Sequence, residues 1–113
     1  MYQSMRFTER FGVDVVERES PPCGRGQVRV RTLYSGISAG TELTAYRGTN
    51  PYLNSVWNPD LTLFDPGSGE GPAYPLEAWG YSEVGRIVEA GDEVVGVHVG
   101  DVVWGIWGHR SEA

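Results

Sequence analysis

Hydrophobic and polar residues alternate most clearly in the segment QVRVRTLYSG, residues 27–36. Val28, Val30 and Thr32 fall on one side of an extended chain, and two arginines fall on the other. A period of two places successive side chains on opposite faces of a β-strand. The pattern therefore predicts a strand with one face toward a core and its arginines on a solvated face.

The same rhythm recurs elsewhere along the chain. VDVVERE, residues 13–19, is a short run rich in β-branched residues, and EVGRIVEAG, EVVGVHVGD and VVWGIWGHR follow in the last third. Gly-Asp pairs at 91–92 and 100–101 separate these last three runs. Such pairs are typical of tight turns between strands. The last third thus predicts three strands joined by turns, with His98 inside the second strand.

Two segments break the rhythm. ISAGTELTAYRG, residues 37–48, has too few apolar residues for a long helix, and we expect a single helical turn at residues 41–46. Residues 49–76 hold five of the seven prolines, and we expect a long loop there without regular structure. The loop carries too many aromatic residues for an inert linker, namely Tyr52, Trp57, Phe64 and Tyr74. Loops of this length in compact domains are often functional or disordered.

Length and composition fit a small β-rich domain. The chain has 113 residues, of which 40% are hydrophobic and 21% charged, and it contains 16 glycines and 7 prolines. That length corresponds to one domain, and the many turn residues suit short strands. We therefore expect a mainly β fold, built as a partly closed antiparallel β-barrel with short helical turns.

Charge and cysteine content exclude several classes of function. The formal net charge is −6, and an acidic surface repels phosphate backbones, so we expect no nucleic-acid partner. Cys23 is the only cysteine, which excludes an internal disulfide and a paired-cysteine zinc site. No signal peptide or apolar run long enough to cross a membrane occurs, so we expect no membrane partner and a cytoplasmic location.

Candidate chemistry rests on three hydroxyl residues in glycine-flanked segments, Ser38, Thr41 and Tyr81. Such groups can orient a substrate or pass on a proton, and they can equally cap a turn. The two histidines, His98 and His109, lie far apart from Cys23 in the sequence and give little support to a zinc site. From spacing alone, the residues indicate a β domain without an assigned reaction.

Three longer segments occur in a fixed order from about residue 26 onward: QVRVRTLYSGIS, GYSEVGRIVEAG and VHVGDVVWG. Together they resemble the GroES-like N-terminal catalytic domain of the medium-chain dehydrogenase/reductase family, which includes zinc alcohol dehydrogenases and quinone reductases. The resemblance implies that residues 1–113 form this domain in incomplete form. It also implies that the Rossmann domain that binds the cofactor is absent from this chain, because no glycine fingerprint follows a strand.

The family's zinc-ligand positions hold other residues in this chain. Ser38 stands where the resemblance places a cysteine, and Tyr81 and Ser82 stand in place of the histidine and glutamate of the Gly-His-Glu segment. Serine and tyrosine hydroxyls are poor zinc ligands at neutral pH. Glu83 lies one residue late, and in a strand that step reverses the face of the side chain. The resemblance therefore implies an atypical branch that uses no zinc.

The resemblance implies a substrate-side domain of an NAD(P)-dependent oxidoreductase acting on a small carbonyl, alcohol or enone. Ser38, Thr41 and Tyr81 would then stabilise a developing oxyanion in place of a metal. NAD and NADP remain equal alternatives, and the segment alone is expected to be inactive. We also expect a homo-oligomer with Trp104 or Trp107 in the contact. The alternative is a stand-alone β-barrel binding or assembly module without catalytic activity.

Overall fold

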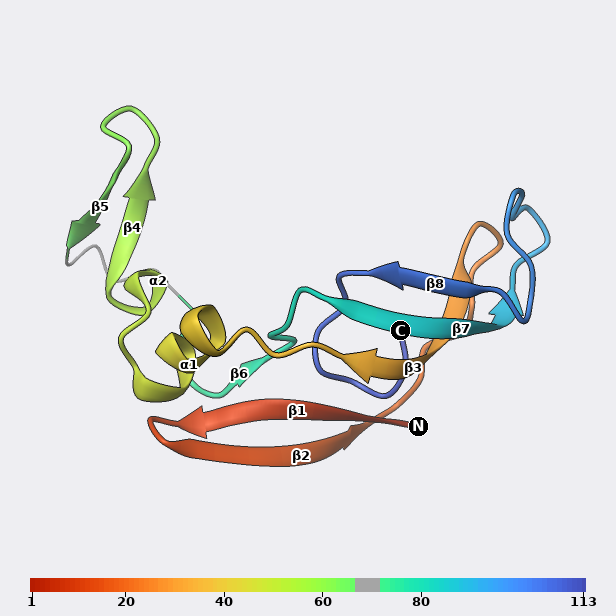
Figure 1. Ribbon diagram of the computed structural model, residues 1–113, viewed down its shortest axis with the longest axis horizontal. Coiled ribbons are helices and arrows are strands. Elements are labelled where there is room, and N and C mark those ends of the chain that lie inside the picture. The colour runs from red at the N-terminus through yellow and green to blue at the C-terminus, as the bar shows by residue number, and fades with distance from the viewer. Residues whose placement is uncertain (67–71) are drawn as a thin grey trace.

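A computed structural model describes residues 1–66 and 72–113 of the chain (Figure 1). Strands dominate the described residues, which confirms the mainly β expectation. The helices are α1 (Ala39–Arg47) and α2 (Pro51–Asn54). The strands are β1 (Tyr2–Glu9), β2 (Gly12–Arg18), β3 (Val28–Ser35), β4 (Ser55–Asn58), β5 (Leu63–Pro66), β6 (Leu76–Glu77), β7 (Glu83–Ala90) and β8 (Val102–Gly105).

The first sheet has the strand order β2-β1-β6 and is antiparallel throughout. Strands β1 and β2 form a long hairpin along one side of the molecule (Figure 1). Charged pairs hold the outer face of this sheet together: the Arg6 guanidinium donates two hydrogen bonds to Asp14, and Arg18 donates two to Glu77 on β6. Phe7 of β1 points inward and is 5% exposed.

The second sheet has the order β3-β7-β8 and contains the alternating segment that the sequence predicts as a strand. Val30 and Ile87 are buried on its inner face. Gly85 of β7 packs against β3, where a Cβ atom would approach Val30 Cγ1 to 2.3 Å, so only glycine allows this close pairing. The outer face carries a row of Tyr34, Val84 and Trp104, paired across the three strands.

The last residues of the chain join the two sheets. The amide of Ser111 donates to the Gln3 carbonyl on β1, and the amide of Thr32 on β3 donates to the Ser111 carbonyl. Two isolated bridges, Ser4 with Arg110 and Arg31 with Glu112, accompany these bonds. Residues 109–113 are therefore held between β1 and β3 by backbone hydrogen bonds on both sides. This arrangement fixes the position of His109.

The hydrophobic core is small and lies where β1, α1 and β6 meet. Its buried members are Phe7, Ala45 and Leu76. The partly buried residues that pack around them are Met5, Tyr46, Leu53, Tyr74 and Trp79. Aromatic rings supply much of this layer, and the Phe7 ring meets the Trp79 ring edge to face at a centroid distance of 6.4 Å. The core anchors α1 against the first sheet.

Several sequence-based expectations need correction. The described part of residues 49–76 is not a structureless loop, because α2, β4 and β5 lie within it and β6 begins at Leu76; β4 pairs with β5 as a third sheet, and residues 67–71 lie outside the described residues. Contacts of Phe64 with Tyr52 and Trp57 stabilise this hairpin, which projects from the body (Figure 1). Helix α1 has nine residues rather than one turn. It ends at Gly48, whose φ of 74° suits a left-handed cap.

The predicted strand at residues 93–101 is also absent from the structure. This segment forms turns, with Gly96 and Gly100 at φ values of 86° and 98°. The Asp101 carboxylate accepts a hydrogen bond from the His98 amide at 2.8 Å, which closes a local turn and competes with strand pairing. Apolar alternation was therefore a misleading signal here, because the glycines and the aspartate favour turns.

The described strands do not close into a barrel. They form three antiparallel sheets, and β2 and β8 lie at open edges of the first two. The expected partial closure is limited to the backbone bridges of residues 109–113 between β1 and β3. Each sheet has only two or three strands, too few to turn a full circle.

Candidate functional site

The three hydroxyl residues singled out in the sequence lie on two neighbouring turns. Ser38 is the N-cap residue of α1, and Thr41 is exposed in the first turn of that helix. Tyr81 is 49% exposed in the turn that precedes β7. The two turns approach each other, because the Gly36 amide donates to the Ser82 carbonyl at 2.7 Å. Among the described residues, no hydrogen bond joins these three hydroxyl groups to one another.

A buried polar cluster lies between these turns. It consists of Ser35, Glu42, Glu83 and His109, which come from β3, α1, β7 and the C-terminal segment. The Glu42 and His109 side chains are 3% and 10% exposed and are joined through Oε1 and Nε2. On the other side of the ring, His109 Nδ1 lies 2.5 Å from Ser35 Oγ. Ser35 Oγ in turn donates to Glu83 Oε1 at 3.3 Å.

Backbone geometry brings these four residues together. Ser35 and Glu83 are direct partners in the β3–β7 register. Glu42 turns back toward the start of α1, where its Oε2 accepts the Ser38 amide at 2.6 Å. A carboxylate near a helix N-terminus is favourable because it satisfies a free N–H and faces the positive end of the helix. The Ser38 hydroxyl itself makes no capping bond.

Gly80 closes the cluster on another side. Its φ is 115°, and a Cβ atom there would lie 2.7 Å from Glu83 Oε1 and 3.0 Å from His109 Nε2. The backbone of the turn thus packs directly against the ionisable groups, and no larger residue fits. Because Gly80 precedes Tyr81, the same contact places the Tyr81 turn beside the cluster.

The cluster contains the kinds of side chain that acid–base chemistry uses. It contains two buried carboxyl groups and an imidazole connected by hydrogen bonds, and Glu83 is 1% exposed. The Trp107 amide donates to Glu83 Oε2 at 2.9 Å, so the second carboxyl is held at both oxygens. Buried ionisable groups held next to one another are typical of sites that transfer protons.

Sequence reasoning did not find this cluster. Two of its members, Ser35 and Glu42, were left aside, and Glu83 and His109 were weighed only as unlikely metal ligands. His109 lies 67 positions from Glu42 and 74 from Ser35, so no local motif joins them. The alternation of side chains along an extended chain did predict one feature of the cluster. Ser82 is exposed and the next residue, Glu83, is buried, because successive side chains of an extended chain point to opposite sides. A polar residue at an inward strand position was the available signal.

A metal ion and a nicotinamide cofactor each require a specific arrangement of residues. Within residues 1–66 and 72–113, no group of three or more His, Cys, Asp and Glu is arranged to hold a metal ion. The strand pairs there are all antiparallel, so the β–α–β unit that binds a dinucleotide pyrophosphate does not occur among them. The described residues therefore offer no such unit to hold a nicotinamide cofactor.

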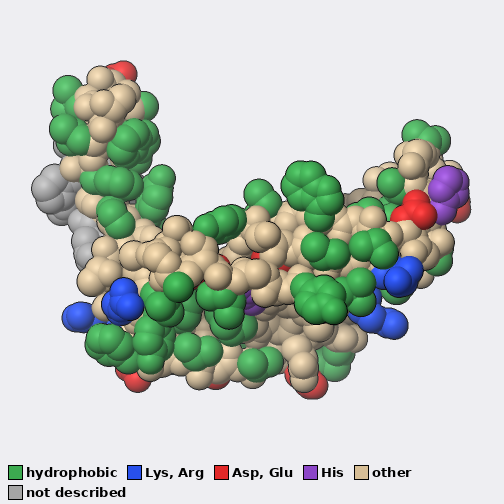
Figure 2. All heavy atoms as spheres, viewed as in Figure 1, with side chains coloured by type: hydrophobic (Ala, Val, Ile, Leu, Met, Phe, Trp, Pro, Cys, Tyr) green, Lys and Arg blue, Asp and Glu red, His purple; other side chains and the backbone are tan. Residues whose placement is uncertain are grey.

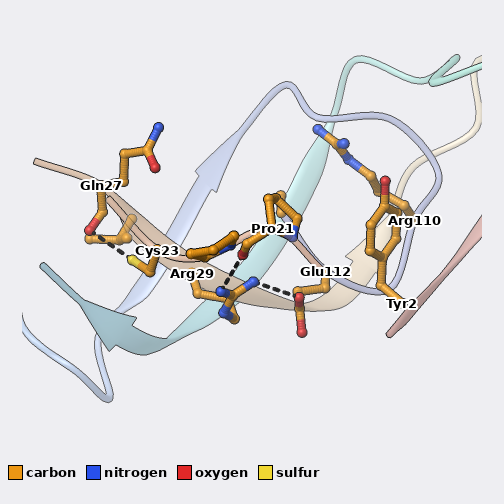
Figure 3. A pocket seen from close by; sticks show the side chains of 10 residues that line it. Tyr2, Pro21, Cys23, Gln27, Arg29, Arg110 and Glu112 are labelled. Atoms are coloured by element: carbon orange, nitrogen blue, oxygen red, sulfur yellow. Dashed lines mark hydrogen bonds and ion pairs between the residues drawn. The ribbon is translucent and has the colours of Figure 1, made fainter. Parts of the chain in front are cut away.

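A pocket of about 370 Å³ lies elsewhere, beside the C-terminal segment (Figure 3). Its lining includes Tyr2, Cys23, Arg29, Arg110 and Glu112. None of the three candidate hydroxyl residues lines it. Two of its charges pair with each other, because the Arg29 guanidinium donates to Glu112 and also to the Pro21 carbonyl (Figure 3). We favour the buried cluster as the chemical site, because its ionisable groups converge, whereas the pocket offers mainly space.

Carboxylates outside the cluster have ordinary structural roles. A hydrogen bond from Arg18 is the main reason that the pKa of Glu77 is lowered. The nearby Ser20 and the Arg29 guanidinium lower the pKa of Glu112 against the opposing effect of burial. These groups remain ionised and hold strands together, and nothing in their geometry indicates a reaction.

Helices long and apolar enough to cross a bilayer do not occur among the described residues.

Comparisons with known proteins point to one kind of enzyme. The chain is 29% identical over 101 residues to the D-guloside 3-dehydrogenase of Escherichia coli (strain K12), and equally to that of Shigella flexneri. The alignment covers 87% of this chain and 29% of the relatives' length. No protein-family model matches the chain. The chain is therefore distantly similar to a dehydrogenase, and it spans less than a third of the length of these relatives.

Proposed function

We propose that this chain is the substrate-side domain of a zinc-independent, NAD(P)-dependent oxidoreductase. Its substrate is a small molecule with an alcohol, carbonyl or enone group, and a glycoside such as a D-guloside is the first class to test. The observation that carries this proposal is the similarity to D-guloside 3-dehydrogenase over 87% of the chain. The buried acid–base cluster beside the Tyr81 turn supports it, because oxidation or reduction at oxygen also moves a proton.

The proposal extends to the fold and the cofactor. The strand segments of residues 26–113 resemble the GroES-like domain of the medium-chain dehydrogenase/reductase family, and we propose that relationship for this chain. The nicotinamide cofactor would be bound by a domain outside the 113 residues and would supply hydride chemistry. The replacement of the family's zinc ligands by Ser38, Tyr81 and Ser82 supports zinc independence. A cytoplasmic location also belongs to this proposal.

Tyr81, Ser38 and Thr41 would bind the reacting oxygen. Tyr81 is the strongest of these candidates, because it is half exposed and its neighbour Gly80 touches the acid–base cluster. Ser38 adjoins Glu42 through its amide, while its hydroxyl is not used as a helix cap. Donors aimed at a developing oxyanion stabilise it most strongly when they are held rigidly in place.

The test is an assay of the complete protein that contains this domain, with NADH or NADPH and a panel of glycosides, alcohols, aldehydes and enones. We expect turnover with one substrate class. Tyr81→Phe should lower kcat/KM about 100-fold if the hydroxyl stabilises the transition state. Tyr34→Phe is the matched control, because Tyr34 is 77% exposed on the outer sheet face. Absence of turnover with both cofactors would refute the proposed activity.

A second candidate function is a stand-alone binding or assembly module. The projecting β4–β5 hairpin favours it, because it exposes Trp57, Leu61 and Leu63 by 41%, 61% and 46%. Hydrophobic side chains gather along this hairpin in Figure 2. If Trp57→Ala abolishes binding of a protein partner while the complete protein shows no redox activity, the module is the better description.

We also propose that the chain forms a homo-oligomer through the outer face of the second sheet. Trp104 is 85% exposed there, and β8 is an edge strand. Trp107 fits such a contact poorly, because its Nε1 donates to Thr32 Oγ1 at 2.9 Å and its ring is half-buried. Light scattering over a concentration series should show association that Trp104→Ser weakens. A strict monomer at millimolar concentration would refute this contact.

A further inference from the structure

The pocket of about 370 Å³ is formed by side chains that share one face of the C-terminal segment and its neighbouring strands (Figure 3). Arg110 and Glu112 form the backbone bridges to β1 and β3, respectively. They are two residues apart in an extended segment, so their side chains point to the same face. Both line the pocket, together with Tyr2 of β1 and Arg29 of β3. The pocket therefore lies on the face where the C-terminal segment joins the two sheets.

Much of the remaining wall is apolar. Pro21 and Pro22, from the connection between β2 and β3, line it together with Val28 at the start of β3. Proline has a fixed φ and no backbone N–H, so this part of the wall is stiff and offers few donors. Cys23 lies at the opposite end of the row of lining residues from Arg110 (Figure 3). A ligand that extends between these two ends would contact mainly apolar groups along its length.

Arg110 supplies a positive charge that lacks a counter-ion. Its Nε atom is buried and has no hydrogen-bond partner among the described residues. The ion pairs within residues 1–66 and 72–113 do not include Arg110. A guanidinium that has lost part of its hydration without gaining a carboxylate is costly to the fold. An anion bound at the remaining nitrogens of Arg110 would offset this cost.

The other charges of the pocket compensate each other. The Arg29 guanidinium lies 2.9 Å from a Glu112 oxygen and 2.8 Å from a Glu89 oxygen. The charged residues in the lining are therefore two arginines and one glutamate, which gives a local excess of one positive charge in a chain of net charge −6. One uncompensated cation matches a monoanion better than a phosphate, which carries close to two negative charges at neutral pH. The planar guanidinium also matches the two oxygens of a carboxylate.

We propose that this pocket binds a small monocarboxylate with an apolar body, with the carboxylate on Arg110 and the body along Pro21 and Pro22. The volume lies near the lower end of the range for small-molecule sites, about 300–1,000 Å³, so a single ring or a short chain fits. The site is separate from the buried cluster and from Ser38, Thr41 and Tyr81, and it does not depend on the proposed redox function.

The first experiment is calorimetric titration of the complete protein that contains this domain with 3-phenylpropanoate. We expect saturable binding. The uncharged 3-phenylpropanamide has the same body and should bind at least about 10-fold more weakly, because it cannot pair with the guanidinium. Inorganic phosphate should also bind more weakly than 3-phenylpropanoate. Equal affinity for the amide, tighter binding of phosphate, or no saturable binding of 3-phenylpropanoate up to about 10 mM would each overturn the proposal.

Variants of Arg110 locate the carboxylate. Arg110→Gln should weaken binding of 3-phenylpropanoate at least about 10-fold, and Arg110→Lys, which keeps the charge without the planar fork, should have an intermediate effect. Arg25→Gln removes an exposed arginine that does not line the pocket and should leave the affinity unchanged. Circular dichroism checks that each variant folds. Unchanged affinity in a folded Arg110→Gln variant would overturn the assignment.

A measurement on the wild-type protein tests the position of the ligand without relying on a variant. Cys23 lines the pocket and is the only cysteine of the 113 residues, so its alkylation by iodoacetamide reports on this site. Mass spectrometry of the peptide that contains Cys23 gives the rate. With 3-phenylpropanoate at about ten times its Kd, alkylation should slow about 10-fold, because only the unoccupied protein reacts. Saturating ligand that leaves the rate unchanged would place the ligand elsewhere and overturn the proposal.

Discussion

The buried cluster and the β4–β5 hairpin reverse the usual distribution of polar and apolar residues. In the cluster, Glu42 and Glu83 are inside, at 2% and 1% exposure. In the hairpin, Trp57 and Leu61 are outside, at 41% and 61% exposure. Each region departs from the rule that hydrophobic residues are buried and charged residues exposed. The difference lies in what compensates each departure.

In the cluster, hydrogen bonds that link four separate segments compensate the burial of charge. In the hairpin, the aromatic rings contact mainly each other, with Phe64 packed against Tyr52 at 5.0 Å and Trp57 at 5.1 Å between centroids. The first region is therefore coupled to the whole fold, while the second is stabilised locally. We therefore expect mutations in the cluster to lower the free energy of unfolding strongly, and mutations in the hairpin to lower it only slightly.

The largest effect should come from breaking the cluster. Glu42→Ala removes one carboxylate and leaves His109 and the Ser38 amide without their partner. Loss of one member of a buried ionic network typically costs about 3–5 kcal/mol. Urea unfolding followed by circular dichroism measures the free energy of unfolding. Glu93→Ala, at an exposed site, should change it by less than about 0.5 kcal/mol. A loss below about 1 kcal/mol for Glu42→Ala would show that the cluster contributes little to the stability of the whole fold.

The second comparison uses the same substitution in the core and in the hairpin. Phe7→Ala empties a site that is 5% exposed in the core and should cost about 3–4 kcal/mol in unfolding free energy. Phe64→Ala removes only local ring contacts and should cost about 1 kcal/mol or less. Equal costs in parallel urea titrations would mean that the hairpin belongs to the cooperative core.

The third comparison separates contact with the cluster from backbone strain. Gly80 and Gly96 both have positive φ, at 115° and 86°. A Cβ at Gly80 meets Glu83 and His109 within 3.0 Å, whereas a Cβ at Gly96 meets nothing within 4 Å. Gly96→Ala should therefore cost about 1 kcal/mol from strain alone. Gly80→Ala should cost about 3 kcal/mol, because strain and collision combine. If thermal or urea unfolding shows the same loss of stability in the two variants, the Gly80 turn does not pack against the cluster.

The smallest effect should come from Glu77, a carboxylate that is more exposed than those of the cluster. Glu77 is partly exposed, and its pKa is lowered chiefly by the hydrogen bond from Arg18. A lowered folded-state pKa stabilises the fold above the unfolded value, and this contribution is lost as pH falls through the folded value. Between about pH 5 and pH 3, wild type should lose stability slightly more steeply than Arg18→Gln. Arg25→Gln, an exposed control, should follow wild type. Identical slopes in wild type and Arg18→Gln would exclude this contribution.

The mainly β character and the strand β3 were predictable from alternation at residues 28–32, because that pattern depends only on neighbouring residues. The turn at residues 93–101 was mispredicted, because alternating valines hid the glycines that adopt positive φ. Hydroxyl residues at 38, 41 and 81 were predictable as candidates, and two of their turns do meet. The members of the neighbouring buried cluster were not predictable, because they lie on segments that are distant in sequence.

The sequence by itself determined the periods, turns and charges that make this a small β-rich acidic domain, since each of these depends on residues close together in the chain. Only the tertiary structure decided that His109 lies between Glu42 and Ser35. That position depends on the backbone hydrogen bonds that hold residues 109–113 between β1 and β3. It also depends on the turn of α1 that directs Glu42 inward. Such contacts form between segments that share no local pattern, so the chemistry of the cluster appears only once the chain is folded.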